Sequence, residues 1–340
     1  MGRSRTVFIT GATAGVGRAV ARRFAGAGDR VGILARDPEA LEEVRRELAV
    51  LGAEAACESV DVADADAVFA AAARLEDTLG PVDVWINDAM ETVFSRVADI
   101  SPAEFQRVTD VTYLGFVHGT MAALKSMRPR GQGRIVQMGS ALAYRGIPLQ
   151  AAYCGAKHAI RGFTDSLRAE LLAEGSQITV TIVELPAVNT PQFDWARAHL
   201  GRTPRPMGRP VEPEAVADAV YRATAGRWRE YWLGWPTILL ILGDFVLPGA
   251  LDRYLAGAAI EGQQTKTPIA HDRPDNLDHP VTSLHRVRGS FGREAETHAP
   301  LVVGELARLG AVAAGALVFF AAGALVMARR GARRRLQAAD

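Results

Sequence analysis

Short apolar runs alternate with longer amphipathic segments along most of this chain. The strand-length runs occupy residues 6–10, 30–35, 54–60, 82–86, 133–138, 178–185 and 230–233. Helical patterns occupy residues 18–28, 38–51, 65–79, 102–127, 151–173 and 213–225. This alternation predicts an α/β fold with a doubly wound parallel sheet, in which ligands bind at the carboxyl ends of the strands. Those ends carry Thr10, Arg36, Asp61, Asn87, Ser140 and Pro186.

Two later segments depart from this alternation. Residues 235–251 are strongly apolar, but two prolines and an aspartate interrupt them, so we expect them to close an apolar substrate pocket or to form a dimer or membrane-facing surface. Residues 263–298 are polar and predict an irregular or disordered linker whose histidines, which lack metal-ligand spacing, are solvated.

The third departure is an apolar stretch near the end of the chain. Residues 309–328 contain no charged side chain, and a helix of this length at ~1.5 Å per residue spans ~30 Å, the thickness of a bilayer core. Five arginines follow between residues 329 and 335. We expect a membrane-associated helix, although an alanine-rich helix packed on the protein is the alternative. A single span, an interfacial helix and a hairpin with residues 235–251 all remain open.

These patterns divide the chain into three parts. We expect one catalytic domain over residues 1–260 with a mobile lid at about 190–213, a linker over 261–300, and the apolar helix within 301–340. The formal net charge of +1 lacks the basic excess of a nucleic-acid binder. Cys57 and Cys154 form no motif, which suits a reducing cytoplasm.

A glycine-rich turn separates the first expected strand from the first helix. It reads Thr10-Gly11-Ala12-Thr13-Ala14-Gly15-Val16-Gly17. Glycines let the backbone approach a pyrophosphate, and a helix N-terminus offers free N–H groups. The turn therefore predicts a dinucleotide site.

The end of the second strand bears on which dinucleotide binds. The sequence there is Ala35-Arg36-Asp37, with no carboxylate at Ala35 to bind a ribose 2′-hydroxyl. An arginine at this position favours a 2′-phosphate, so we expect NADP(H). Asp37 stands before Pro38 and suits a helix N-cap instead.

Candidate chemistry lies between Ser140 and Lys157. Tyr153 and Lys157 are four residues apart and share one face of the predicted helix. An ammonium nearby favours the phenolate and lowers the pKa of a tyrosine, while a serine hydroxyl can polarise a carbonyl oxygen. The set suits the interconversion of a ketone and an alcohol, although the same apolar-flanked residues also fit an ordinary buried helix face.

Across residues 4–255 the chain resembles the classical short-chain dehydrogenase/reductase family, which has the Rossmann fold. The matching motifs are Thr10-Gly11-x-x-x-Gly15-x-Gly17 and Ser140…Tyr153-x-x-x-Lys157. The resemblance implies that Tyr153 is the general acid/base, that Ser140 orients the carbonyl and that Lys157 binds the nicotinamide ribose. The cofactor-binding residues it implies are Thr10, Gly11, Thr13, Gly15, Val16, Gly17, Arg36, Asp61, Val62, Asn87, Tyr153, Lys157, Pro186, Val188 and Thr190.

Three positions depart from the family pattern. The usual Asn-Asn-Ala-Gly is Asn87-Asp88-Ala89-Met90, and the Pro-Gly after the sixth strand is Pro186-Ala187. The active-site asparagine corresponds to Thr112, which cannot copy an amide in a proton relay but completes the candidate catalytic set with Ser140, Tyr153 and Lys157.

The sequence thus predicts a membrane-attached, metal-free NADP(H)-dependent oxidoreductase that acts on a lipophilic ketone, aldehyde or alcohol. A non-catalytic NADP(H)-binding scaffold or sensor is the alternative, and epimerisation or dehydration on the same site is a second one. The resemblance also implies a homo-oligomer.

Overall fold

The computed structural model describes residues 4–270, 272–317 and 320. Its centre is an eight-stranded sheet of order β12-β10-β7-β6-β4-β1-β2-β3. The strands are β1 (Thr6–Thr10), β2 (Arg30–Ala35), β3 (Ala55–Ser59), β4 (Val84–Asn87), β6 (Gln132–Met138), β7 (Gln177–Glu184), β10 (Glu230–Leu233) and β12 (Leu301–Val303). All neighbours pair in parallel except β12, which is antiparallel to β10. The predicted Rossmann-like α/β fold is confirmed, with β12 as an unexpected edge strand.

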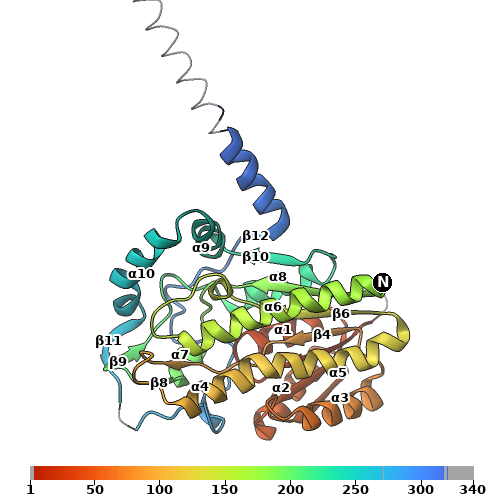
Figure 1. Cartoon of the computed structure of the whole chain (residues 1–340). Helices are drawn as coiled ribbons and strands as arrows, with labels where there is room; N and C mark the ends of the chain where they lie inside the picture. Colours follow the sequence, from red (N-terminus) through yellow and green to blue (C-terminus); the bar gives the residue numbers. More distant parts are fainter. Residues whose placement is uncertain (1–3, 271, 318–319, 321–340) are drawn as a thin grey trace, which may run out of the picture.

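Helices cover both faces of this sheet (Figure 1). One layer holds α1 (Gly15–Ala25), α2 (Pro38–Val50) and α8 (Pro213–Ala223), and the other holds α3 (Ala65–Leu79), α4 (Pro102–Thr109), α5 (Gly115–Arg130) and α6 (Ala151–Ala173). Each layer buries its own apolar cluster against the sheet. Trp85 and Phe8, both fully buried, meet edge-to-face in the second cluster.

The single helix expected over residues 102–127 is instead two α-helices. A π-helical turn, Asp110–Leu114, separates α4 from α5. A Cβ on Gly115 would lie only 2.6 Å from a Val62 methyl carbon, so glycine permits the close approach of this turn to the end of β3. The π-turn also carries Thr112.

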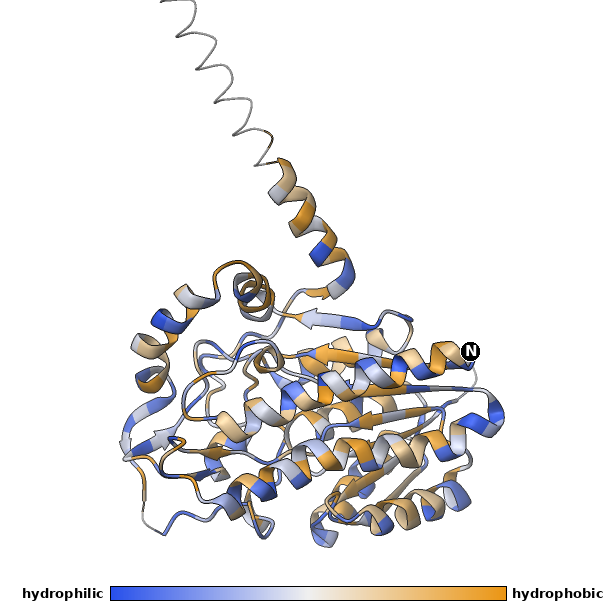
Figure 2. Ribbon diagram, viewed as in Figure 1, coloured by the Kyte–Doolittle hydropathy of each residue, from blue (hydrophilic) through white to orange (hydrophobic). Residues whose placement is uncertain are grey.

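The apolar segment 235–251 forms one helix and begins a second. Helix α9 (Trp235–Val246) packs on Tyr144 and Trp232, and α10 (Pro248–Gly262) follows it. Strand β11 (Gln264–Pro268) then pairs with β9 (Arg202–Pro204) from the predicted lid. Large apolar side chains remain exposed on α9 and after it: Trp235, Leu239, Phe245, Val246 and Leu247. Figure 2 shows this apolar character along α9.

Residues 272–298 have little regular structure, as expected, but they pack against the catalytic domain. Gly289 donates its N–H to the carbonyl of Asn189, and Glu296 exchanges backbone hydrogen bonds with the segment before α8. The expectation of solvated histidines is wrong for His285, whose side chain is 8% exposed and lies 3.0 Å from a carboxylate oxygen of Asp37. Tertiary contacts therefore hold this segment in place.

A final helix starts at residue 304 beside β12 and runs away from the domain (Figure 1). Arg308 in its first turns contacts Glu230 and Tyr144. Among the residues that the structure describes, no helix is both long enough and apolar enough to cross a bilayer. Half of the predicted membrane helix at 309–328, and all of the arginine-rich end, lies outside the described residues. Membrane attachment therefore stays a prediction.

Candidate active site

The turn between β1 and α1 needs its glycines for close backbone contacts. Gly11 has φ +73°, and a Cβ there would lie 2.7 Å from Cα of Ala89. A Cβ on Gly17 would lie 2.4 Å from the carbonyl oxygen of Gly11. The Thr10 hydroxyl accepts the N–H groups of Asp88 and Ala89, which ties the turn to the end of β4. The N-cap residue of α1, Ala14, makes no side-chain hydrogen bond, whereas the Asp88 carboxyl accepts the N–H of Gly17 in the first turn. A helix N-terminus at this turn suits a phosphate.

A cavity lies along the carboxyl ends of β1, β2, β3 and β4. Its position at the strand ends and its glycine-lined end suit a dinucleotide. Eight of the predicted cofactor residues line it: Gly11, Thr13, Gly15, Val16, Arg36, Asp61, Val62 and Thr190. The other seven do not line this cavity: Thr10, Gly17, Asn87, Tyr153, Lys157, Pro186 and Val188. The structure therefore brings the glycine turn, Arg36 and the implied cofactor contacts Asp61 and Val62 to one cavity.

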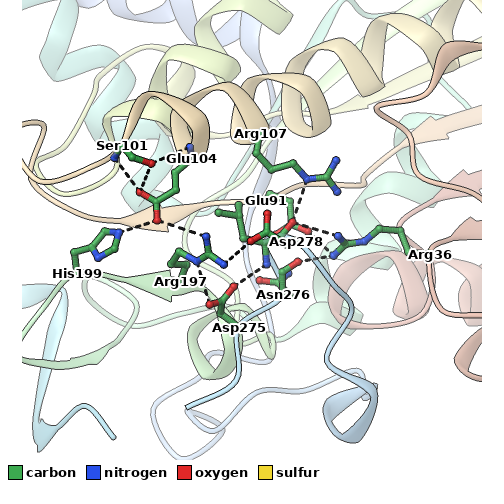
Figure 3. Close-up of polar contacts among 11 residues, drawn as sticks. Arg36, Glu91, Ser101, Glu104, Arg107, Arg197, His199, Asp275, Asn276 and Asp278 are labelled. Atoms are coloured by element: carbon green, nitrogen blue, oxygen red, sulfur yellow. Dashed lines mark hydrogen bonds and ion pairs between the residues drawn. The ribbon is translucent and has the colours of Figure 1, made fainter. Parts of the chain in front are cut away.

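Arg36 lines this cavity and is already bound by oxygen atoms (Figure 3). Its Nη2 donates to a carboxylate oxygen of Glu91 at 2.7 Å and to the carbonyl of Asn276 at 2.6 Å. The Glu91 side chain is 3% exposed, and its burial raises the pKa of the carboxyl to about 8 although Arg36 and Arg107 oppose that rise. Sequence reasoning missed Glu91, whose only signal is an acidic residue directly after Asn87-Asp88-Ala89-Met90.

Asp61 forms an ion pair at the same end of the cavity. Its carboxylate accepts a hydrogen bond from Arg107 at 2.6 Å and another from the N–H of Ala63. Burial raises the pKa of Asp61 and these hydrogen bonds lower it, with a net result below the ordinary value. Asp61 therefore remains an anion that anchors α4 to the end of β3.

The candidate catalytic side chains come together beyond the inner end of the cavity. Ser140 follows β6 and accepts the N–H of Leu142, while Tyr153 and Lys157 occupy successive turns at the start of α6. The Lys157 ammonium donates to the carbonyl of Met138 at 2.6 Å and lies 5.5 Å from the centroid of the Tyr153 ring. The predicted convergence of this set is thus present.

Burial dominates the electrostatics of these groups. It raises the pKa of the Tyr153 hydroxyl, an effect that the Ser140 hydroxyl opposes. The net direction is upward, opposite to the lowering expected from Lys157. Burial also lowers the pKa of the Lys157 ammonium, and the carboxyl groups of Asp88 and Glu184 oppose this. Asp88 lines the cavity and interacts with both Tyr153 and Lys157, so it connects the cavity to the catalytic set.

Two predicted site residues have structural partners instead. Asn87 is fully buried, accepts a hydrogen bond from Trp85 and donates to Thr120 and Gln137. The hydroxyl of Thr112, also fully buried, accepts the N–H of Glu91 and donates to the carbonyl of the same residue. Thr112 therefore holds the backbone that positions Glu91, and its relay role stays a prediction.

The segment after β7, which carries the implied cofactor residues Pro186, Val188 and Thr190, approaches the glycine turn. A Cβ on Gly15 would lie 3.1 Å from the Thr190 methyl carbon. Val188 is buried and forms a bridge with Val211, and Pro186 contacts the Gly234 turn. Of the three predicted residues, Thr190 alone lines the cavity.

Comparison with known proteins agrees with this geometry. Residues 5–200 match the short chain dehydrogenase family. The chain is 32% identical to an uncharacterized oxidoreductase, YxnA, of Bacillus subtilis, over 78% of this chain and 75% of that protein. It is 38% identical to dehydrogenase/reductase SDR family member 7B of Bos taurus, but that match spans 55% of this chain and 59% of the relative.

Solved structures give the same result. A single-substitution variant of the actinorhodin polyketide ketoreductase with NADPH superposes with a TM-score of 0.58 at 31% identity, and the match covers 64% of this chain and 89% of that one. These similarities support oxidoreduction at a CH–OH group with a nicotinamide cofactor. The chain belongs to the short-chain dehydrogenase/reductase family.

Proposed function

We propose that the protein is an NADP(H)-dependent oxidoreductase that interconverts a ketone or aldehyde with an alcohol. The observation that carries this proposal is the convergence of Ser140, Tyr153 and Lys157 beside a glycine-lined dinucleotide cavity. A nicotinamide cofactor, which Gly11, Gly15 and Arg36 would hold in that cavity, would supply or accept the hydride. The remaining chemistry is proton transfer, which belongs to the protein's own side chains.

Tyr153 is the proposed proton donor in the reductive direction. Its raised pKa keeps the hydroxyl protonated, so Oη can donate to the substrate oxygen as that oxygen gains charge. Ser140 supplies a second hydroxyl for the same oxygen. The Lys157 ammonium, held by Met138, keeps a positive charge near the phenol and favours the phenolate that forms.

Arg36 supports NADP(H) as the preferred cofactor. It lies at the end of β2, where Ala35 provides no carboxylate for a ribose hydroxyl. A guanidinium at this position can pair with a 2′-phosphate through two parallel hydrogen bonds. The NADPH complex of the ketoreductase neighbour is consistent with this choice.

We further propose that the substrate is lipophilic and that the protein attaches to a membrane through residues 309–328. We also propose that it forms a homo-oligomer. The apolar side chains exposed on α9 support an apolar contact surface. Activity on lipid-derived ketones, with none on sugars or keto acids, is the expected outcome. The reverse pattern would refute the lipophilic substrate.

The test is the oxidation of NADPH by the full chain against a panel of apolar ketones and aldehydes, followed by absorbance. Tyr153→Phe is the control, because it removes the proton and keeps the ring. We expect turnover that falls by about 10²–10⁴-fold in this variant. Equal turnover by the two proteins would contradict the assignment of Tyr153.

A non-catalytic NADP(H)-binding role is the second candidate. The observation that favours it is Thr112, whose hydroxyl is occupied by the backbone of Glu91. This role predicts NADPH binding without turnover of any substrate in the panel.

A further inference from the structure

A segment far along the chain forms one wall of the cofactor cavity. We call residues 275–286 the C-terminal strap. The strap follows β11 and contributes Asn276, Pro280, Val281 and His285 to the cavity lining. It lies outside residues 5–200, the part that matches the family. The cavity is therefore completed by a segment that lies outside the family match.

The strap binds the arginine that the proposed function assigns to the cofactor (Figure 3). Arg36 donates from Nη2 to the carbonyl of Asn276 at 2.6 Å and from Nη1 to the carbonyl of Leu277 at 3.3 Å. Nη2 also donates to Glu91 at 2.7 Å. Both Nη2 hydrogens are therefore already hydrogen-bonded. A guanidinium can form a bidentate pair with a phosphate through its Nη1/Nη2 edge or its Nε/Nη2 edge, and both edges include Nη2. A 2′-phosphate can form such a pair only if one of these oxygens gives way.

Two ion pairs outside the cavity hold the strap in this position. We call Arg197, Asp275 and Asp278, which form them, the latch. The guanidinium of Arg197 pairs with Asp275 at 3.0 Å and with Asp278 at 2.7 Å. Asp275 in turn accepts the N–H of Leu277, so the latch is connected directly to the residues that hold Arg36. Neither Arg197 nor the two aspartates line the cavity. The latch can therefore be released without changing a residue that contacts the cofactor site.

We propose that the C-terminal strap is a specificity element of the cofactor site, in which the carbonyls of Asn276 and Leu277 compete with the 2′-phosphate of NADP(H) for Arg36. The proposal rests on the proposed function of Arg36 as the phosphate ligand. NAD(H) has a hydroxyl at that position and does not require Nη2 to be released. The strap thus lowers the ratio of the affinity for NADP(H) to the affinity for NAD(H).

A second contact of the strap affects both cofactors alike. The N–H of Gly15 donates to the carbonyl of Arg286, and Arg18 donates to the carbonyl of His285. These contacts lie at the glycine turn, where the pyrophosphate common to both dinucleotides binds. The ratio of the two affinities therefore isolates the competition at Arg36.

The test compares dissociation constants of NADPH and NADH for the full chain and for latch variants. Arg197→Ala releases both aspartates, and Asp278→Ala, at an exposed side chain, is the milder second variant. Arg128→Ala is the matched control, because Arg128 forms an exposed ion pair with Glu174 away from the cavity. We expect the NADPH-to-NADH affinity ratio to rise about tenfold in Arg197→Ala, the equivalent of about one charge-assisted hydrogen bond. The control variant should keep the wild-type ratio.

Arg36→Ala separates failure of this proposal from failure of the proposed cofactor. If Arg36→Ala leaves the NADPH-to-NADH ratio unchanged, Arg36 is not the phosphate ligand and the underlying function is at fault. If Arg36→Ala weakens NADPH binding while both latch variants keep the wild-type ratio, or lower it, the strap proposal is overturned.

Hydrogen exchange of the wild-type chain gives an independent measurement. Saturating NADPH should speed exchange of the Leu277 amide relative to saturating NADH, since only the 2′-phosphate displaces the carbonyls of Asn276 and Leu277 from Arg36. Equal exchange with the two cofactors would contradict the competition.

Discussion

Glu184 is a carboxyl group whose burial makes the stability of this protein depend on pH. It ends β7 and is fully buried. Burial, reinforced by the nearby Glu230, raises its pKa from 4.5 to about 8, while the Ser140 N–H and Lys157 oppose the rise. The folded pKa is above the unfolded one, so the protonated form is favoured on folding. The associated stability is present below pH 4.5 and is lost as pH rises through about 8.

Glu184→Gln removes this titration and retains most of the side chain's volume. The two pKa values, at about 1.4 kcal/mol per pH unit, correspond to about 3 kcal/mol of stability lost by the wild type between about pH 5 and pH 8. Glu184→Gln should not lose this stability, because its amide does not titrate. Its free energy of unfolding, relative to wild type, should therefore rise by about 3 kcal/mol over that range.

The assay is urea unfolding followed by tryptophan fluorescence at several pH values. Glu170→Gln, at an exposed position of α6, is the control. Glu91 and Asp88 titrate in the same direction in both proteins, so their contributions cancel in the difference. Parallel curves of unfolding free energy against pH for wild type and Glu184→Gln would refute the reasoning.

Three further outcomes follow from the site. Gly17→Ala would place a Cβ 2.4 Å from the carbonyl oxygen of Gly11, so we expect about 1–3 kcal/mol lower stability in thermal unfolding and weaker NADPH binding by calorimetry; wild-type values would contradict this. Glu91 ionises as pH rises through about 8 beside Arg36, so NADPH affinity should fall above pH 8 in wild type and stay level in Glu91→Gln. Lys157→Met should lower kcat of the NADPH assay by about 10²-fold or more, and an unchanged kcat would exclude its catalytic role.

Local chemistry explains why much of the site could be read from the sequence. The glycine turn lies within one βα unit, so consecutive residues form the whole predicted phosphate site. Tyr153 and Lys157 are one helical turn apart, so their shared face follows from helix geometry. Ser140 follows a strand whose carboxyl end faces the same edge of the sheet. These positions were predictable because the hydrophobic pattern of each segment matches the periodicity of the helix or strand that it forms.

Interactions between distant segments could not be read in this way. The π-turn between α4 and α5 depends on the approach of Gly115 to Val62, and an uninterrupted helical pattern conceals it. The upward shift in the pKa of Tyr153 depends on burial, which a spacing of four residues cannot express.

The α/β alternation, the glycine turn and the candidate catalytic residues could all be read from the sequence, because each arises from residues close together in the chain or from the regular order of strands. What Arg36 binds depends instead on tertiary contacts. Glu91 and the carbonyls of Asn276 and Leu277 reach it from two other parts of the chain. Backbone carbonyls are present at every residue and carry no sequence signal, so their meeting with one guanidinium depends on how the whole chain folds.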